Sequence, residues 1–314
     1  MIVAHVITAH VIATRVMVAR AGRLLAIALL AAAWAPHVLS QPVMVTDDDG
    51  RQIHLEQPAR RIISLAPSMT ELLFAAGAGS ALVGVSEYSD YPPQALDIEI
   101  IGRFDLINTE AILALQPDLV VAWRSGNPRA AVQRLIDLGL NVYVGEPTTL
   151  ESIPEHLQRL AILAGTEAAG NAAAQELSQR LNVMKTGYRD STPLRVFYQV
   201  WNEPLISVGG REIINDVITL CGGINIFADQ GLAPKVSIEA VLQRRPQVII
   251  ASGMDVSRPE WLDDWRRWPQ LPAVADDNLY HIPPDLLQRQ TPRVLDGAEQ
   301  MCRQLDEARQ KSGG

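Results

Sequence analysis

Residues 166–188 read TEAAGNAAAQELSQRLNVMKTGY, and the fold of the chain follows from this segment. The segment is rich in strong helix formers and contains no proline, so it predicts one uninterrupted helix. Gly165 is expected to end the preceding helix, and Thr166 is expected to cap the new one. At about 1.5 Å per residue such a helix would be on the order of 30 Å long, which is enough to connect two lobes.

An internal repeat flanks this helix. Residues 110–122, EAILALQPDLVVA, align without a gap with residues 239–251, EAVLQRRPQVIIA. Each copy predicts a short helix, a proline turn and a buried strand. Two unrelated units are the alternative, but the shared glutamate, proline and apolar run favour two lobes of one architecture. We therefore expect two α/β lobes, residues 41–165 and 189–314, bridged by one long rigid helix over 166–188.

The first forty residues have the pattern of a secretory signal peptide. They contain three arginines and no acidic residue, and an apolar run over residues 24–35 precedes small residues before Gln41. A transmembrane anchor is the alternative, but the run is shorter than the ~20 residues that a bilayer core needs. No cysteine follows the run, so we expect residues 1–40 to be removed and the mature protein to be soluble in the periplasm. Met17 is an alternative start.

The charge of the mature chain excludes some partners. Removal of the three arginines of residues 1–40 would take the formal net charge from −8 to −11. A strongly acidic protein is unsuited to nucleic acid or to anionic membrane surfaces. We expect neither as a partner.

The chain contains two cysteines, Cys221 and Cys302. In an exported protein a disulfide is the first interpretation of such a pair, and two buried free thiols are the alternative. A catalytic thiol is not expected, because Cys221 lies beside Gly222 with no histidine close in sequence.

Motifs of common enzymes are absent from the sequence. It contains no G-x-S-x-G, G-x-x-x-x-G-K-[ST], G-x-G-x-x-G or H-E-x-x-H motif. Beyond residue 40 only His54, His156 and His281 remain, and they are expected on a hairpin, a helix and a strand, so no metal site is predicted. We expect a binding protein, and an exported α/β hydrolase is the alternative from another class.

Aromatic residues fall in loops where predicted strands end. In open α/β sheets ligands bind beyond the carboxyl ends of the strands. We therefore expect Trp123 and Tyr88 to lie on one rim that faces the ligand. Large apolar faces with a few polar groups suit a big, flat, partly amide-covered small molecule. Core packing is the alternative for Tyr143 and Trp201. The candidate ligand-binding residues are Tyr88, Trp123, Tyr143, Trp201, Asp285 and Arg289.

Four motifs in order carry a resemblance to a known family. They are SEYSDYPPQ at residues 86–94, AWRSGN at 122–127, CGGINIF at 221–227 and DLLQRQTPR at 285–293. Together they resemble the periplasmic cobalamin-binding proteins of vitamin B12 ABC importers. The similarity extends from about Arg60 to the C-terminal helix.

The resemblance implies two α/β lobes bridged by a rigid helix, with cobalamin held in the cleft between them. Tyr88 and Trp123 would contact the corrin ring from the first lobe, and Tyr143 stands where the family has a tryptophan. Asp285 and Arg289 would bond the ligand from the second lobe. The protein would perform no covalent chemistry.

The same resemblance assigns three further positions and shows two departures. Cys221 and Cys302 match the disulfide of the family, and Glu239 matches a glutamate that docks on arginines of the ABC permease. Arg129 stands at the corresponding docking position of the first lobe, where the family has a glutamate. Ala233 stands where the family has a ligand-contacting tryptophan, which would loosen binding or change the preferred corrinoid.

We therefore expect a monomeric periplasmic protein that captures cobalamin or another corrinoid and delivers it to an ABC permease. No cofactor is expected, because the corrin brings its own cobalt. A haem or ferric-siderophore carrier of the same fold is the alternative. Siderophore carriers usually need basic or polar residues to meet anionic ligands, so a cleft expected to lack an Arg/Lys cluster speaks against that alternative.

Overall fold

A four-stranded parallel sheet forms the centre of the N-terminal lobe, which we define as the elements from β1 to α5. The strand order is β4-β3-β7-β8, and every neighbouring pair is parallel, so all four carboxyl ends lie at one edge. Strand β7 is almost wholly apolar and buried, as expected of a strand covered on both faces. The strands are β3 (Ile62–Ser64), β4 (Leu82–Val85), β7 (Leu119–Trp123) and β8 (Val142–Gly145).

Helices and two small hairpins complete this lobe. The helices are α2 (Pro67–Ala75), α3 (Thr109–Ala114), α4 (Arg129–Asp137) and α5 (Ser152–Ala164), with 3-10 turns η1 (Gly79–Ala81) and η2 (Pro93–Asp97). The hairpins are β1 (Val43–Thr46) with β2 (Gln52–Leu55), and β5 (Gly102–Arg103) with β6 (Leu106–Ile107). The computed structural model describes residues 42–253 and 256–312, so the predicted signal peptide, residues 1–40, lies outside the described residues.

The C-terminal lobe, defined as β9 to α11, is built on a five-stranded sheet. Its order is β10-β9-β12-β13, and β11 also pairs with β9. The strands are β9 (Leu194–Asn202), β10 (Leu205–Ser207), β11 (Gly223–Asn225), β12 (Val248–Ala251) and β13 (Leu279–His281). The helices are α7 (Ile213–Leu220), α8 (Ile238–Arg244), α9 (Pro272–Ala275), α10 (Pro284–Leu287), α11 (Val294–Ser312) and the 3-10 helix η3 (Glu260–Arg267).

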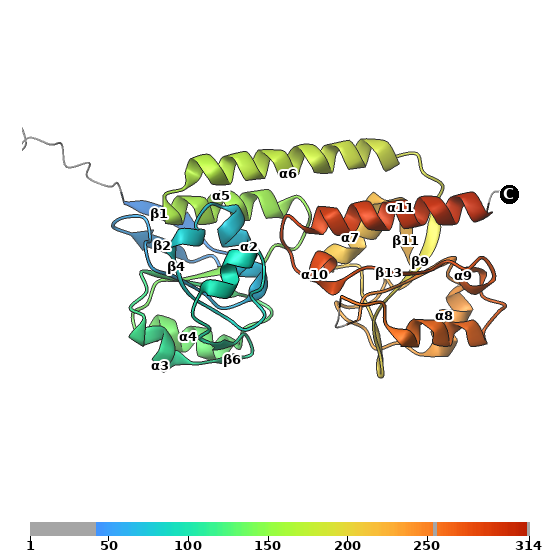
Figure 1. Cartoon of the computed structure of the whole chain (residues 1–314), viewed down its shortest axis with the longest axis horizontal. Helices are drawn as coiled ribbons and strands as arrows, with labels where there is room; N and C mark the ends of the chain where they lie inside the picture. The colour runs from blue at the N-terminus through green and yellow to red at the C-terminus, as the bar shows by residue number, and fades with distance from the viewer. Residues whose placement is uncertain (1–41, 254–255, 313–314) are drawn as a thin grey trace, which may run out of the picture. The chain divides into compact units, whose positions relative to one another are not determined.

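The predicted connecting helix is α6 (Glu167–Tyr188), which confirms the interpretation of residues 166–188. Gly165 ends α5 in the left-handed region, with φ of 68°, as glycine does at helix ends. Gly170 lets α6 approach α5 closely, because a Cβ there would lie 2.3 Å from the Cβ of Ala161. Figure 1 shows α6 beside α5 at its beginning and extending toward α11, and α6 packs on both. The fold is therefore two α/β lobes joined by one long helix, as predicted.

Two other sequence predictions about the fold are confirmed. The repeat copies form equivalent units, α3 followed by β7 and α8 followed by β12. A disulfide joins Cys221, at the end of α7, to Cys302 in α11, so the alternative of two free thiols is wrong. Among the described helices, none combines the length and the apolarity that crossing a bilayer would require.

Candidate ligand-binding site

A cavity of about 740 Å³ lies where strands β7 and β8 end. Residues of both lobes line it, and its volume is within the range of small-molecule sites. Apolar side chains form much of the wall: Val132, Val144, Val208, Ile213, Ile214 and Leu287. Polar and charged residues are interspersed among them, as in sites that orient a ligand through a few specific contacts.

Trp123 is the aromatic residue of this wall. It is the last residue of β7, and its indole is half-buried. Its backbone N–H donates to Oδ1 of Asn127 at 2.6 Å, and the amide of Asn127 donates to the carbonyls of Leu65 and Phe104 at 2.9 and 2.7 Å. The predicted position of Trp123 at the carboxyl edge of the sheet is confirmed. Its contact with a ligand stays a prediction.

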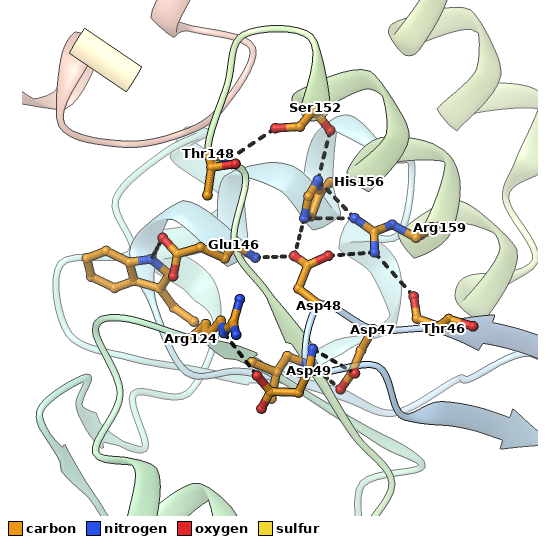
Figure 2. Close-up of polar contacts among 12 residues, drawn as sticks. Thr46, Asp47, Asp48, Asp49, Arg124, Glu146, Thr148, Ser152, His156 and Arg159 are labelled. Carbon is orange, nitrogen blue, oxygen red and sulfur yellow. Dashed lines mark hydrogen bonds and ion pairs between the residues drawn. The ribbon is translucent and has the colours of Figure 1, made fainter. Parts of the chain in front are cut away.

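Glu146 follows β8 and faces Trp123 across the same edge of the sheet. Its Oε1 accepts hydrogen bonds from the indole Nε1 of Trp123 at 3.3 Å and from the hydroxyl of Ser125 at 3.1 Å. Its Oε2 accepts the backbone N–H of Ser125 at 2.7 Å. Figure 2 labels Glu146 and draws its carboxylate beside an indole, which the hydrogen bond from Nε1 identifies as that of Trp123. Both carboxylate oxygens are thus engaged by neighbouring residues of the same wall.

Asp48, at the tip of the β1–β2 hairpin, holds the backbone of Glu146 in place. Oδ2 of Asp48 accepts the backbone N–H of Glu146 at 2.5 Å and lies 2.7 Å from Nε2 of His156, while Oδ1 accepts a hydrogen bond from Arg159 at 2.7 Å (Figure 2). Burial alone would raise the pKa of Asp48, but the hydrogen bond and charge of His156 and the hydrogen bonds from Arg159 and the Glu146 backbone outweigh it and hold that pKa well below its usual range.

A hairpin was expected around His54, but this role of its tip was not predicted. The hairpin tip reaches the cavity itself, because Asp49 lines it and pairs with Arg124 at 3.0 Å. The available signal was the run of three consecutive aspartates at the turn. Such a run is more acidic than a turn requires, since one Asp or Asn commonly suffices to form its backbone hydrogen bonds.

The cavity carries both signs of charge. Arg124, Arg129 and Arg211 line it, so the expectation of a cleft without a basic cluster is wrong. Glu146 and Glu212 also line it, from opposite lobes. Burial raises the pKa of Glu212, and the negative charge of Glu146 raises it further. Arg129, which the sequence analysis placed at a permease-docking position, therefore contributes to the cavity wall as well.

Arg289 connects the two lobes instead of lining the cavity. Its guanidinium donates to Oε1 of Glu71 at 2.8 Å, to Oδ1 of Asp90 at 2.7 Å and to the carbonyl of Tyr88 at 3.2 Å. It also pairs with Asp285 within its own lobe at 3.0 Å. The guanidinium of Arg289 and Oδ1 of Asp285 therefore have protein partners, and the contact of both residues with a ligand stays a prediction.

Glu71 is the buried centre of these interlobe contacts. Its side chain is 3% exposed, and it also accepts hydrogen bonds from Thr291 at 2.9 Å and from Arg293 at 3.1 Å. Burial raises the pKa of Glu71, although the hydrogen bonds and charges of Arg289 and Arg293 oppose that effect. A buried carboxylate with three partners in the other lobe holds the lobes together at this edge. We call Glu71, Arg289, Thr291 and Arg293 the interlobe network.

Two other predicted aromatic residues lie outside the cavity wall. Tyr88 follows β4 and is 69% exposed. Trp201 is partly exposed near the end of β9, and its indole donates to the carbonyl of Glu203 at 2.9 Å. The structure therefore does not bring Tyr88 and Trp201 to the cavity that Trp123 lines.

Tyr143 lies in the core of the N-terminal lobe and not on the cavity wall. It was a candidate ligand-binding residue with core packing as the alternative, and its side chain is fully buried in the core, with the guanidinium of Arg159 5.8 Å from the ring centroid. The reason is that all four residues of β8 are buried. Successive side chains of a strand point to opposite faces of the sheet, so Val144, the neighbour of Tyr143, lines the cavity, as does Glu146 beyond the end of the strand.

The described residues contain no group of three or more His, Cys, Asp or Glu side chains that could hold a metal ion. His156 is 2% exposed, and its Nδ1 lies 2.8 Å from the carbonyl of Ser152. Its other nitrogen faces Asp48, so this histidine belongs to the support of the hairpin tip.

Two α/β lobes, a long connecting helix and a partly apolar cavity between sheet ends define a solute-binding protein. The family model described as periplasmic binding protein matches residues 62–286, and the chain belongs to this family. Its members are binding proteins, which agrees with the expectation that the chain is not an enzyme.

Curated relatives and a solved structure within this family are similar to the chain over most of its length. The chain is 43% identical over 250 residues to the Vitamin B12-binding protein of Vibrio cholerae, covering 79% of this chain and 90% of that protein. It is 39% identical to the Vitamin B12-binding protein of Yersinia pestis, covering 79% and 87%. The crystal structure of the periplasmic vitamin B12 binding protein BtuF of Vibrio cholerae superimposes with a TM-score of 0.74 at 42% identity, covering 80% of this chain and 98% of that one.

Haem-binding proteins share the fold at lower identity. The periplasmic heme binding protein HutB of Vibrio cholerae matches with a TM-score of 0.69 at 22% identity, covering 78% of this chain and 98% of that one. At this identity the likeness extends to the architecture alone.

Proposed function

We propose that this protein binds cobalamin or a related corrinoid in the cavity beside Trp123 and delivers it to an ABC permease. The observation that carries the proposal is the half-buried indole of Trp123 on a largely apolar wall, a surface suited to the face of a flat macrocycle. The names of the relatives that are about 40% identical over most of the chain support the same ligand.

The remaining predicted contacts belong to this proposal. Tyr88, Trp201, Asp285 and Arg289 lie beyond the described cavity wall, so they would meet the parts of a large ligand that extend past it. The corrin supplies its own cobalt, and the protein then needs no metal or other cofactor. Residues 41–165 and 189–314 would act as two lobes that adjust around the helix over 166–188.

Glu239 is the proposed contact with the permease. It lies exposed in the first turn of α8, and its backbone N–H and the hydroxyl of Ser237 lower its pKa. The carboxylate is therefore ionised at neutral pH and free to meet an arginine of a membrane partner. We further propose that residues 1–40 direct a monomeric protein to the periplasm.

A haem carrier is the second candidate, and one observation favours it. Arg124, Arg129 and Arg211 line the cavity, and arginine readily binds carboxylates such as the propionates of haem. Glu146 and Glu212 on the same wall oppose an anionic ligand, while the carboxyl oxygens of Glu212 suit the amide N–H groups around a corrin ring.

Isothermal titration of the mature chain with cyanocobalamin and, separately, with haemin tests the proposal. Submicromolar binding of cyanocobalamin, with quenching of tryptophan fluorescence, is the expected result. Binding of haemin without binding of cyanocobalamin would replace the first candidate by the second. The absence of heat and of quenching with both ligands would overturn both.

A further inference from the structure

We propose that Glu146 is a positioning residue that holds the indole of Trp123 in its ligand-facing orientation. The inference deepens the proposed function and rests on it, because the orientation of Trp123 matters only if a ligand packs on the indole. Neither Glu146 nor the hairpin tip behind it was among the residues that the sequence singled out. The geometry of the site leads to both.

The indole of Trp123 lies near the ring of Phe104, with 6.2 Å between the ring centroids. Two further contacts restrict it. One is the hydrogen bond of Nε1 to Glu146. The other is close packing over Gly126, where a Cβ would lie only 1.7 Å from Cε3 of the indole. The indole is held at its polar edge by Glu146 and lies against the backbone of Gly126.

Glu146 is itself immobilised. Ser125 donates two hydrogen bonds to its carboxylate, and Asp48 accepts its backbone N–H. Asp48 is bound in turn to His156, which is 2% exposed, and to Arg159, both on α5. A continuous series of hydrogen bonds therefore connects the core of the N-terminal lobe to the cavity wall, and Figure 2 shows it.

A fixed indole favours binding through a lower entropic cost. Ordering a free side chain at an interface costs conformational entropy, and a side chain that is already ordered avoids that cost. Glu146 also lines the cavity, together with Glu212 of the opposite lobe. Its negative charge raises the pKa of Glu212, so Glu146 is not a purely internal support.

The first measurement follows the indole in the unliganded protein. The measurement is the NMR spectrum of ¹⁵N-labelled protein. The indole N–H signal of Trp123 is identified there as the one that disappears in Trp123→Phe. Glu146→Ala should move this signal and leave the other tryptophan signals in place. Glu146→Gln retains an acceptor oxygen at the same reach and should restore the signal to near its original position. Glu110→Ala, at an exposed glutamate of α3, is the matched control and should change nothing.

The second measurement is affinity for cyanocobalamin. Glu146→Ala should weaken it about tenfold, which corresponds to about 1.4 kcal/mol, and Glu146→Gln should stay within about threefold of the original. If Glu146→Ala fails to fold, Glu146→Asp replaces it, because a side chain one methylene shorter keeps the charge but loses its reach to Nε1. It should move the signal in the same way.

The outcomes separate the inference from the proposed function. If the Trp123 signal does not move in Glu146→Ala or Glu146→Asp, the inference is overturned. The same holds if the variant loses thermal stability while the signal stays in place. A moved signal with unchanged affinity also overturns it. If the original protein does not bind cyanocobalamin, the proposed function is overturned instead. The titration is then repeated with haemin, and the affinity for haemin must show the same dependence on Glu146.

Discussion

The guanidinium of Arg289 in the C-terminal lobe donates a hydrogen bond of 2.8 Å to the buried carboxylate of Glu71 in the N-terminal lobe. Asp90, near the end of β4, joins the same guanidinium at 2.7 Å. These ion pairs therefore connect the two lobes near the end of β4, at one side of the sheet. The cavity lies at the other side of the same sheet, where β7 and β8 end. The helix α6 is thus not the sole connection between them.

Loss of the central carboxylate should destabilise the protein. Glu71→Gln leaves Arg289 and Arg293 without their buried counter-charge, and removal of one partner of a buried ion pair typically costs about 3–5 kcal/mol. We expect about 3 kcal/mol, because Arg289 retains Asp90 and Asp285. Urea denaturation measures the free energy of unfolding, with Glu176→Gln on the exposed face of α6 as control. A loss below about 0.5 kcal/mol would contradict a stabilising role for the interlobe network.

Acid should destabilise the protein in part through Asp48. Its pKa is lower in the folded chain than in the unfolded chain, where it is about 3.9. The unfolded state therefore binds more protons as the pH falls through that value, and the stabilisation present above it is progressively lost. Asp48→Asn should lower the Tm at pH 7 and flatten the decrease in Tm between pH 5 and pH 3.

Scanning calorimetry across this pH range measures the effect. Each kcal/mol of stability corresponds to roughly 2–4 °C in Tm for a domain of 150–250 residues. The exposed Asp190→Asn is the control and should keep the original slope. Parallel Tm curves for Asp48→Asn and the original protein would show that Asp48 does not contribute to the acid response.

The disulfide should stabilise the C-terminal lobe. It joins Cys221 and Cys302, which are 81 residues apart. Constraint of a loop of that length in the unfolded chain corresponds to about 4–5 kcal/mol in the chain-entropy model. The double variant Cys221→Ala, Cys302→Ala should therefore unfold at lower urea concentration. Equal midpoints for the oxidised original and the double variant would exclude this contribution.

Two tryptophans should differ in their effect on cyanocobalamin binding. Trp123 lines the cavity, whereas Trp201 does not. Trp123→Ala should weaken binding at least tenfold, since stacking and burial of a large aromatic ring contribute about 1.5 kcal/mol or more. Trp201→Ala should have a smaller effect. Isothermal titration of both variants measures the difference, and the reverse order of effects would place the ligand elsewhere.

The sequence was informative about local structure and about one aromatic residue. Helix propensity and a terminal glycine predicted α6 with its boundaries, and the repeat predicted equivalent units in both lobes. Trp123 was placed correctly because strand ends can be located from an apolar run followed by polar residues. Tyr143 was misplaced, because a residue in a strand covered on both faces cannot be distinguished by type from one at the rim.

What the sequence by itself determined is therefore the set of elements, the two-lobed arrangement and the position of Trp123 at a strand end, because these follow from short-range propensity and periodicity. Only the tertiary structure revealed which polar groups meet. Asp48 and His156 are 108 residues apart, and Arg289 and Glu71 are 218 apart. Such pairs leave no local pattern, since a charged side chain far along the chain becomes a partner only when the packing of the helices and sheets brings it within hydrogen-bonding distance.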